Sequence, residues 1–220
     1  MLITEKAQQF INQEDRFGAH NYHPLPVVLS RGKGVYVWDV DGKKYFDFLS
    51  AYSAVNQGHC HPKIVRALTE QAETLCLTSR AFYNDCLGPY EEFVHRYFGY
   101  DKMLPMNSGA EAVETGLKLA RKWGYLKKGI PENEAIIVAC EGNFHGRTIT
   151  IVSLSTDGEA RAEYGPYTPG IEVIPYNDVD ALQQIFEVKG DKIAGFLVEP
   201  IQGEAGVFVP DDGYLKACKH

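Results

Sequence analysis

The stretch AIIVACEGNFHGRT, residues 135–148, decides the fold. Its first part, Ala135 to Ala139, is a continuous apolar run that predicts a strand buried on both faces. Its second part, Gly142 to Thr148, is a loop with a glycine near each end that carries an aromatic ring, a histidine and an arginine. In parallel α/β sheets, ligands bind in loops beyond the carboxyl ends of the strands, so this loop is a candidate site.

The segments on either side repeat the alternation of helix and strand. Upstream, residues 103–106 form a short apolar run that predicts a strand, and apolar residues at helical spacing predict a helix from about Gly109 to Gly124. Downstream, Asp178 could cap a helix that reaches about Val188, and further buried strands are predicted at 149–154, 171–174 and 193–198. This order predicts an α/β fold with a mostly parallel sheet flanked by helices.

The N-terminal segment has a different pattern. A short helix in the first dozen residues precedes an irregular stretch in which Pro24 and Pro26 disfavour helix. Residues 35–40 and 43–48 are rich in β-branched and aromatic side chains, and Asp41-Gly42 between them suits a tight turn. The segment therefore predicts a β-hairpin.

Two further helices are predicted after the hairpin, at about 62–75 and 87–98. We expect residues 1–54 to form an N-terminal segment with the hairpin and residues 55–220 to form the first part of a larger domain. The last residues, 213–220, read as the beginning of a helix without a glycine or proline stop signal. A cut inside an element is the expectation, and a naturally frayed terminal helix is the alternative.

Charge argues against nucleic acid as a partner. The chain has 220 residues, of which 45% are hydrophobic and 23% charged, and its formal net charge is -7. Its basic residues are scattered, so they form no electrostatic footprint for a phosphate backbone. The expected partners are small molecules.

The cysteines and the hydropathy of the sequence indicate which cellular compartment, and which disulfide or metal sites, to expect. Five cysteines, an odd number without a C-x-x-C pair, argue against a disulfide framework or a zinc ribbon. His59-Cys60-His61 lacks a second ligand cluster, so no metal is expected. No apolar run is long enough to span a membrane, and no signal or transit pattern is present, so the expected location is the cytoplasm. A removed presequence would make the mitochondrial matrix the alternative.

The segment Asn107 to Glu111 is the first of three candidate loops. Ser108 and Glu111 have the S-x-x-E spacing of a capping box, and Gly109 allows a ligand to approach the backbone. Exposed amides and the helix dipole favour an anion such as phosphate there. The alternative is a plain helix cap, which this spacing alone favours.

The loop from Gly142 to Thr148 is the second. Phe144 or His145 could stack on a flat ring, and Arg147 could hold a carboxylate through two parallel hydrogen bonds. A polar loop with one surface arginine is the alternative.

The third loop, residues 199–206, follows the last predicted strand. It carries two carboxylates, Glu199 and Glu204, which are costly to bury without a positive partner. General acid-base catalysis and a supporting role both fit this pair, and the spacing does not decide between them.

Taken together, these loops and two N-terminal segments resemble the ornithine aminotransferases, a family of class-III aminotransferases. The specific segments are AHNYHPLPV at 19–27 and FLSAYSAVNQGHCHP at 48–62. LPMNSGAEA at 104–112 and the loops at 142–148 and 199–206 match in order and spacing, although the first of these patterns is shared across class III. The resemblance covers essentially the whole chain.

The resemblance implies a fold-type I (aspartate aminotransferase-like) enzyme that uses pyridoxal 5'-phosphate and works as a homodimer with shared active sites. Its reaction transfers the δ-amino group of L-ornithine to 2-oxoglutarate, giving glutamate 5-semialdehyde and glutamate. Of the matching residues, Ser108, Gly109 and Ala110 would hold the cofactor phosphate. Phe144 would stack on the ring with His145 beside it, and Glu199 would support the cofactor region.

The resemblance also implies substrate-binding residues. Tyr22 and Arg147 would bind the α-carboxylate end of the substrate, and Tyr52 would shape the pocket. Glu204 would pair with a C-terminal arginine that controls which end of a substrate enters. Holding ornithine by its α-carboxylate would place the terminal amine at the cofactor.

The chain departs from the family at its end. The family's Schiff-base lysine and the aspartate at the ring nitrogen both follow the third loop, and the sequence ends sixteen residues after Glu204. We therefore expect the 220-residue chain to be the N-terminal half of the enzyme, and to be inactive alone. Two alternatives stay open: another class-III ω-aminotransferase, acting on acetylornithine or 4-aminobutyrate, and a non-catalytic binding protein.

Overall fold

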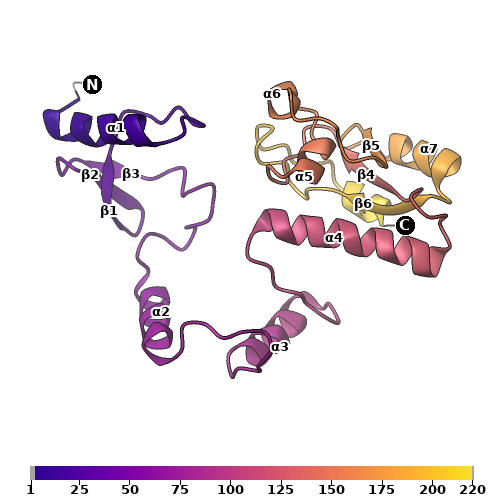
Figure 1. Ribbon diagram of the computed structural model, residues 1–220, viewed down its shortest axis with the longest axis horizontal. Coiled ribbons are helices and arrows are strands. Elements are labelled where there is room, and N and C mark those ends of the chain that lie inside the picture. Colours follow the sequence, from indigo (N-terminus) through magenta and orange to yellow (C-terminus); the bar gives the residue numbers. More distant parts are fainter. Residues whose placement is uncertain (1–2, 220) are drawn as a thin grey trace. The chain divides into compact units, whose positions relative to one another are not determined.

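The structure is a computed structural model that describes residues 3–219 (Figure 1). The chain divides into two compact units, residues 1–92 and residues 93–220. The domain boundary expected after residue 54 stays a prediction.

The first unit begins with a helix and a small antiparallel sheet. Helix α1 (Glu5–Phe17) starts where the Thr4 hydroxyl accepts a hydrogen bond from the Ala7 amide, a typical helix cap. The sheet has the strand order β1-β2-β3, formed by β1 (Leu29–Lys33), β2 (Tyr36–Asp39) and β3 (Lys44–Phe46). The predicted hairpin is thus confirmed as β2–β3. Strand β1 is an addition that the sequence did not indicate, because LSRGK has one β-favouring residue at most.

Asp39 explains why the chain turns tightly after β2. One carboxylate oxygen accepts hydrogen bonds from the Asp41 and Lys43 amides at 3.0 and 2.8 Å, and the other accepts one from the Tyr45 hydroxyl at 2.6 Å. The bond to the carboxylate stabilises the protonated phenol and raises the pKa of Tyr45 to about 12. Gly42 is left-handed (φ 82°) whereas Asp41 is not, so the turn is not of the primed type that Asp41-Gly42 suits; the Gly42 amide donates to the Asp39 carbonyl oxygen at 3.0 Å and closes the turn.

Helices α2 (Pro62–Thr74) and α3 (Leu87–Phe98) confirm the two predicted helices after the hairpin. Pro62 occupies the first turn of α2, where its missing N–H has no acceptor to lose. Neither helix has a buried residue, so both leave apolar side chains at the surface.

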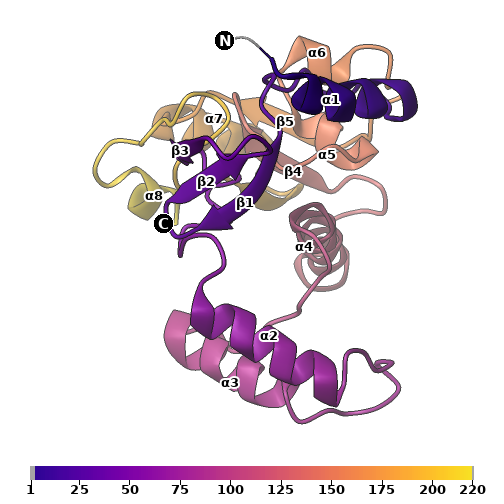
Figure 2. The same cartoon turned by 90° about the vertical axis from the view of Figure 1, so that its left-hand side faces the viewer.

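The second unit is built on a parallel sheet with the strand order β5-β4-β6 (Figure 1), and Figure 2 shows β4 and β5 from another side. The central strand β4 (Ile136–Cys140) pairs with β5 (Ile171–Ile174) on one side and β6 (Ile193–Leu197) on the other. These three strands and the parallel sheet were predicted, and they are confirmed.

Helices cover both faces of this sheet, and β4 shows why. Its residues Val138 and Cys140 pack on one face with α7 (Val179–Lys189) and α8 (Tyr214–Cys218). Its residues Ile137 and Ala139 pack on the opposite face, in a cluster with Leu117 of α4 (Gly109–Trp123) and Leu154 of α5 (Ile149–Leu154). A strand buried on both faces reads as a continuous apolar run, which is the pattern seen in the sequence.

Three short elements complete the unit. The π-helical turn η1 (Gly124–Lys128) continues α4 and ends at the left-handed Gly129, and α6 (Gly158–Arg161) follows α5. The predicted cap of α7 is confirmed, because the Asp178 side chain accepts a hydrogen bond from the Ala181 amide at 2.8 Å.

Two predicted strands are wrong. Residues 149–154 form helix α5, with Ile151, Val152 and Leu154 buried. A short apolar run does not distinguish a buried strand from a buried helix, and the packing of this segment on the sheet decides for helix. Residues 103–106 are irregular, and Pro105 explains this because it has no N–H for a strand ladder.

Gly170 lies directly before β5, and replacing it tests how closely the backbone packs at the start of the parallel sheet. Its φ is +73°, and an added Cβ would lie 2.6 Å from the Ala135 carbonyl oxygen. We expect Gly170→Ala to lower the free energy of unfolding by about 2 kcal/mol or more, from left-handed strain and this clash. Equilibrium urea unfolding measures the change. Gly158→Ala is the matched control because its added Cβ meets nothing within 4 Å, and equal stability of the two variants would refute the expectation.

Candidate functional site

The N-terminus of α4 carries the first candidate loop. The Ser108 hydroxyl caps the helix by accepting from the Glu111 amide at 3.2 Å. The Glu111 carboxylate accepts from the Asn107 amide at 3.0 Å, one residue before the position that a capping box predicts. The first amides of a helix have no acceptor within it, so those of Gly109 and Ala110 are available to a ligand. An added Cβ at Gly109 would meet nothing within 4 Å, which leaves the approach to the backbone open.

The loop from Gly142 to Thr148 lies against this helix start. Gly146 has a φ of +132°, and an added Cβ there would lie 3.0 Å from the Ala110 Cβ. The Thr148 hydroxyl donates to the Glu114 carboxylate of α4 at 2.5 Å. The first and second candidate loops are therefore neighbours.

Asn143 fixes the base of the second loop. Its side chain is buried, and Nδ2 donates to the carbonyl oxygens of Cys140 and Leu154, each at 2.7 Å. These bonds join the end of β4 to the end of α5, so the loop leaves the sheet along one fixed path. The sequence analysis did not single out Asn143; its only signal is a polar residue shortly after a buried strand.

Glu199 joins the third loop to the second. One of its carboxylate oxygens accepts from the Phe144 amide at 2.8 Å, and the other accepts from the Gly203 amide at 3.3 Å. Gln202, which is also buried and was also missed, adds a second link because its Nε2 donates to the Glu141 carbonyl oxygen at 2.6 Å. Of the two roles left open for Glu199, the structure supports bracing of the loops.

His145 lies in this cluster with an unused ring nitrogen. Its Nε2 is buried and has no hydrogen-bond partner among the described residues. Burial lowers the pKa of His145, and the negative charge of Glu199 opposes this shift only in part. The imidazole is therefore neutral near pH 7, and the buried nitrogen is available to a ligand group.

Phe144, Arg147 and Glu204 are the exposed members of the site. Phe144 presents a partly exposed ring, and the Arg147 guanidinium carbon lies 5.9 Å from its centre. Glu204 is exposed on the third loop. The structure thus brings Ser108, Gly109, Ala110, Phe144, His145, Arg147, Glu199 and Glu204 into one cluster of loops in the second unit.

The remaining two predicted site residues, Tyr22 and Tyr52, belong to the first unit. Both side chains are exposed, with 53% and 69% of their surface accessible. Their roles at the site stay predictions.

The cluster fits a flat anionic cofactor such as pyridoxal phosphate. The amides of Gly109 and Ala110 suit its phosphate, the Phe144 ring suits an aromatic ring, and the buried His145 nitrogen has a hydrogen bond left to make. Among residues 3–219, no group of three or more histidine, cysteine or acidic residues is arranged to hold a metal ion. No helix in that range is long and apolar enough to cross a membrane.

The lowered pKa of His145 implies a pH dependence of stability. Its unfolded pKa is about 6.5 and its folded pKa is lower, so between these values the unfolded chain binds more protons. The stabilisation is complete above about pH 6.5 and is lost as the pH falls toward the folded value. We expect His145→Gln to flatten this part of the stability profile in urea unfolding between pH 7.5 and 5. The exposed His23→Gln is the control, and identical profiles for wild type and His145→Gln would refute the expectation.

Comparisons with known proteins agree with this geometry. The family model described as aminotransferase class-III matches residues 17–220. A protein of Emericella nidulans named ornithine aminotransferase is 60% identical over 98% of this chain and 49% of its own length. One of Arabidopsis thaliana, named as the mitochondrial ornithine aminotransferase, is 61% identical over 97% of this chain and 45% of its own length.

Solved structures give the same picture. The ornithine aminotransferase of Toxoplasma gondii superposes with a TM-score of 0.94 at 48% identity, covering 98% of this chain and 51% of that one. A structure titled acetylornithine aminotransferase, from Elizabethkingia anophelis, gives 0.84 at 57% identity, covering 98% and 50%. The chain spans about half the length of the curated relatives that it matches.

Proposed function

The chain belongs to the class-III aminotransferase family, and from this membership we propose that it forms the first half of an ornithine aminotransferase. The full enzyme transfers the δ-amino group of L-ornithine to 2-oxoglutarate, giving glutamate 5-semialdehyde and glutamate. The observation that carries the proposal is the convergence of three loops at the start of α4. This convergence brings the start of α4, the ring of Phe144 and Arg147 into one cluster of loops, and relatives of this chain carry this enzyme name.

In this proposal the second unit holds the cofactor. When bound, pyridoxal phosphate supplies the carbonyl carbon that receives the amino group and a ring that takes up electrons. Ser108, Gly109 and Ala110 hold its phosphate through backbone amides and the Ser108 hydroxyl. Phe144 stacks on its ring, and the neutral His145 donates or accepts one hydrogen bond beside it.

Glu199 holds the second and third candidate loops together. Its carboxylate ties the Phe144 amide to the Gly203 amide, so the backbone of the second loop is held to that of the third. Because it is engaged by two backbone donors, Glu199 serves as a support for the cofactor region rather than as the group that moves protons.

In this proposal, substrate selection depends on the distance between the group that binds the α-carboxylate and the reactive carbon of the cofactor. Arg147 binds the α-carboxylate through two parallel hydrogen bonds, and Tyr22 donates a third. Tyr52 shapes the pocket, and Glu204 pairs with an arginine of the second half to control which end of a substrate enters. Holding the carboxylate one side-chain length away leaves only the distal amine within reach of the cofactor.

A panel of amino donors tests the proposal. Purified full-length enzyme with pyridoxal phosphate and 2-oxoglutarate is given L-ornithine, N-acetylornithine or 4-aminobutyrate, and glutamate formation is followed. We expect L-ornithine to give the highest kcat/KM. Preference for either other donor would move the assignment within class III, and cofactor binding without transfer from any donor would favour a non-catalytic binding protein.

The competing candidate is an acetylornithine aminotransferase, because a structure with that title is 57% identical to this chain. Tyr22 separates the two readings. We expect Tyr22→Phe to lower kcat/KM for ornithine by about 10- to 100-fold, the loss of one hydrogen bond to a charged group. Tyr83→Phe is the matched control, since this side chain is fully exposed. An unchanged kcat/KM for ornithine in Tyr22→Phe would show that Tyr22 does not bind the carboxylate, and a higher kcat/KM of the wild-type enzyme for N-acetylornithine than for ornithine would favour the competing candidate.

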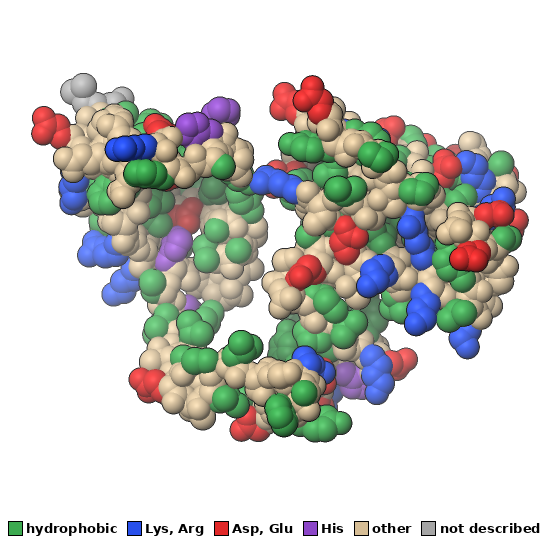
Figure 3. Space-filling model, in the orientation of Figure 1, with side chains coloured by type: hydrophobic (Ala, Val, Ile, Leu, Met, Phe, Trp, Pro, Cys, Tyr) green, Lys and Arg blue, Asp and Glu red, His purple; other side chains and the backbone are tan. Residues whose placement is uncertain are grey.

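We also propose that the enzyme is a homodimer or a higher homo-oligomer. Helices α2 and α3 have no buried residue, and hydrophobic side chains lie at the surface over them (Figure 3). The exposed apolar side chains of the two helices include Ile64, Val65, Leu68, Tyr90, Phe93, Tyr97 and Phe98. Such a concentration is typical of an interface between subunits. Sedimentation velocity of the full-length enzyme measures the state, and a monomer at micromolar concentration would contradict the proposal.

For the location we propose the cytoplasm. The alternative is the mitochondrial matrix, because the names of several relatives, including those of Drosophila melanogaster and Rattus norvegicus, contain the word mitochondrial. Fractionation of cells that express the full-length protein distinguishes the two.

A further inference from the structure

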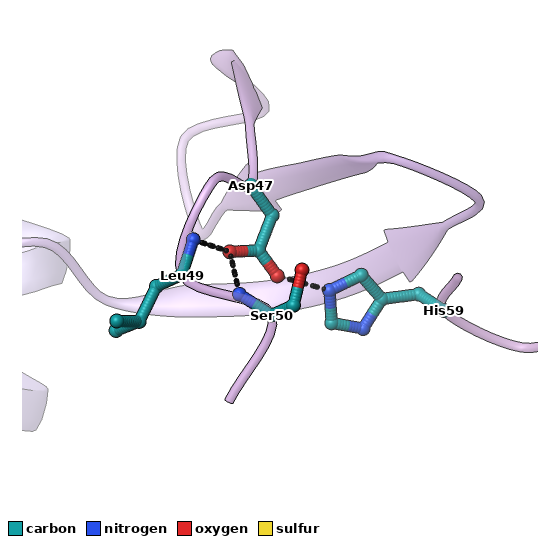
Figure 4. A network of polar contacts seen from close by, with 4 residues as sticks. All are labelled: Asp47, Leu49, Ser50 and His59. Carbon is teal, nitrogen blue, oxygen red and sulfur yellow. Dashed lines mark hydrogen bonds and ion pairs between the residues drawn. The ribbon is translucent and has the colours of Figure 1, made fainter. Parts of the chain in front are cut away.

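A loop in the first unit is closed at both ends by one pair of side chains. This segment, the 48–58 loop, has Asp47 directly before it and His59 directly after it. One Asp47 oxygen accepts from the amides of Leu49 and Ser50 at 3.0 and 2.8 Å, and the other accepts from His59 Nε2 at 2.6 Å (Figure 4). These hydrogen bonds, first that of Ser50 and then that of His59, lower the pKa of Asp47 and keep it ionised.

Both members of the pair are anchored to the same turn of the small sheet. The Asp47 amide donates to the Val35 carbonyl oxygen at 2.9 Å. His59 exchanges two backbone hydrogen bonds with Gly34, at 2.8 and 2.9 Å. Its ring packs on the bare backbone of Gly32, where an added Cβ would lie 2.7 Å from the ring carbon Cγ. These contacts with Gly32, Gly34 and Val35 therefore fix the position of the pair independently of its contacts with the loop.

The backbone of the loop needs such a support. Ser50, Ala51, Tyr52 and Ser53 have φ values of 51°, 48°, 54° and 69°, a run of four non-glycine residues in the left-handed region. L-residues rarely adopt this conformation in succession, and such strain persists only where the surroundings hold it. Asp47 caps the first residue of the run, and the Val55 amide donates to the Ser50 carbonyl oxygen at 3.1 Å.

Tyr52 stands inside this run with an exposed side chain. Its direction is set by the left-handed backbone, and that backbone is set by Asp47 and His59. We propose that the Asp47–His59 pair is a positioning device that holds Tyr52 in the orientation the substrate requires. The inference rests on the proposed function, in which Tyr52 shapes the substrate pocket, and it adds two positioning residues that do not touch the substrate.

Hydrogen exchange tests the structural part without any activity. In the 220-residue chain, His59→Leu removes the donor to Asp47, whereas His59→Gln keeps an amide donor at the place of Nε2. Asp47→Ser is a second variant, because its short side chain still caps the Ser50 amide but does not reach His59. We expect the amides of the 48–58 loop to exchange about tenfold faster in His59→Leu and in Asp47→Ser than in wild type. His59→Gln should retain the wild-type rate, and unchanged exchange in the two disruptive variants would overturn the proposal.

A double-mutant cycle in the full-length enzyme tests the positioning part. We expect His59→Leu to raise KM for L-ornithine by about tenfold with little change in kcat, and His59→Gln to restore KM. In a Tyr52→Ala background the same change should have almost no further effect, because the group that it positions is gone. Effects that multiply in the double variant would overturn the proposal. If the wild-type enzyme does not use ornithine, the proposed function fails, and the exchange experiment still decides whether the pair holds the loop.

Discussion

Replacing Arg147 with alanine is expected to lower kcat/KM for L-ornithine by about 10²- to 10³-fold in the full-length enzyme. In the proposed function the guanidinium binds the α-carboxylate through two charge-assisted hydrogen bonds, and losing both would cost about 3–4 kcal/mol. Because the same contact fixes the distance between carboxylate and cofactor, kcat should fall together with a rise in KM. Steady-state kinetics with ornithine at saturating 2-oxoglutarate measures both values.

Two further variants make this result specific. Arg147→Lys keeps the charge but not the planar pair of donors, and it should fall between wild type and alanine. Arg16→Ala removes an exposed arginine at the end of α1, outside the three candidate loops, and should leave kcat/KM unchanged. Equal kinetics for wild type and Arg147→Ala would show that the carboxylate is held elsewhere.

Changing Gly109 to aspartate should weaken pyridoxal phosphate binding by about 100-fold. The new carboxylate would lie beside the first amides of α4, which we propose as the phosphate site, and two negative charges repel each other at short range. The fold should tolerate the change, because the added Cβ meets nothing within 4 Å and an acidic residue in the first turn of a helix is favourable. Loss of binding would therefore not reflect unfolding. Calorimetric titration with pyridoxal phosphate measures the dissociation constant.

Gly109→Asn is the matched control for this prediction. It adds a side chain of the same size without the charge, so it should weaken binding much less than aspartate does. Similar losses for both variants would indicate a steric effect, and no loss for either would place the phosphate away from the start of α4.

The sequence predicts most of the second unit because its signals are strong. The runs that became β4 and β6 are apolar along their whole length, as strands covered on both faces must be. Asp178 and Ser108 are helix caps in both the sequence pattern and the structure. The predicted fold of type I pyridoxal-phosphate enzymes is confirmed by the likeness to the solved aminotransferases, and class-III membership by the family match.

The errors lie where local signals are ambiguous. The apolar segment 149–154 has the composition of a strand, and only its packing between the sheet and the loops makes it a helix. Strand β1 contains a glycine and two basic residues, so its pairing with β2 depends on contacts outside the segment.

Some residues of the candidate site could be predicted from the sequence, and others could not. Residues that stand in recognisable motifs, such as Ser108 and Arg147, were found in the sequence. Asn143 and Gln202 were not, because a buried amide that joins two loops has no sequence pattern of its own. The bracing role of Glu199 likewise needed coordinates, since spacing alone left two roles open.

One measurement tests the central claim that only the distal nitrogen of ornithine reacts. Full-length enzyme is incubated with 2-oxoglutarate and L-ornithine that carries ¹⁵N either at the δ or at the α position, and the glutamate formed is analysed by mass spectrometry. We expect δ-labelled ornithine to give ¹⁵N-glutamate and α-labelled ornithine to give unlabelled glutamate. Label arriving in glutamate from the α position would contradict the claim.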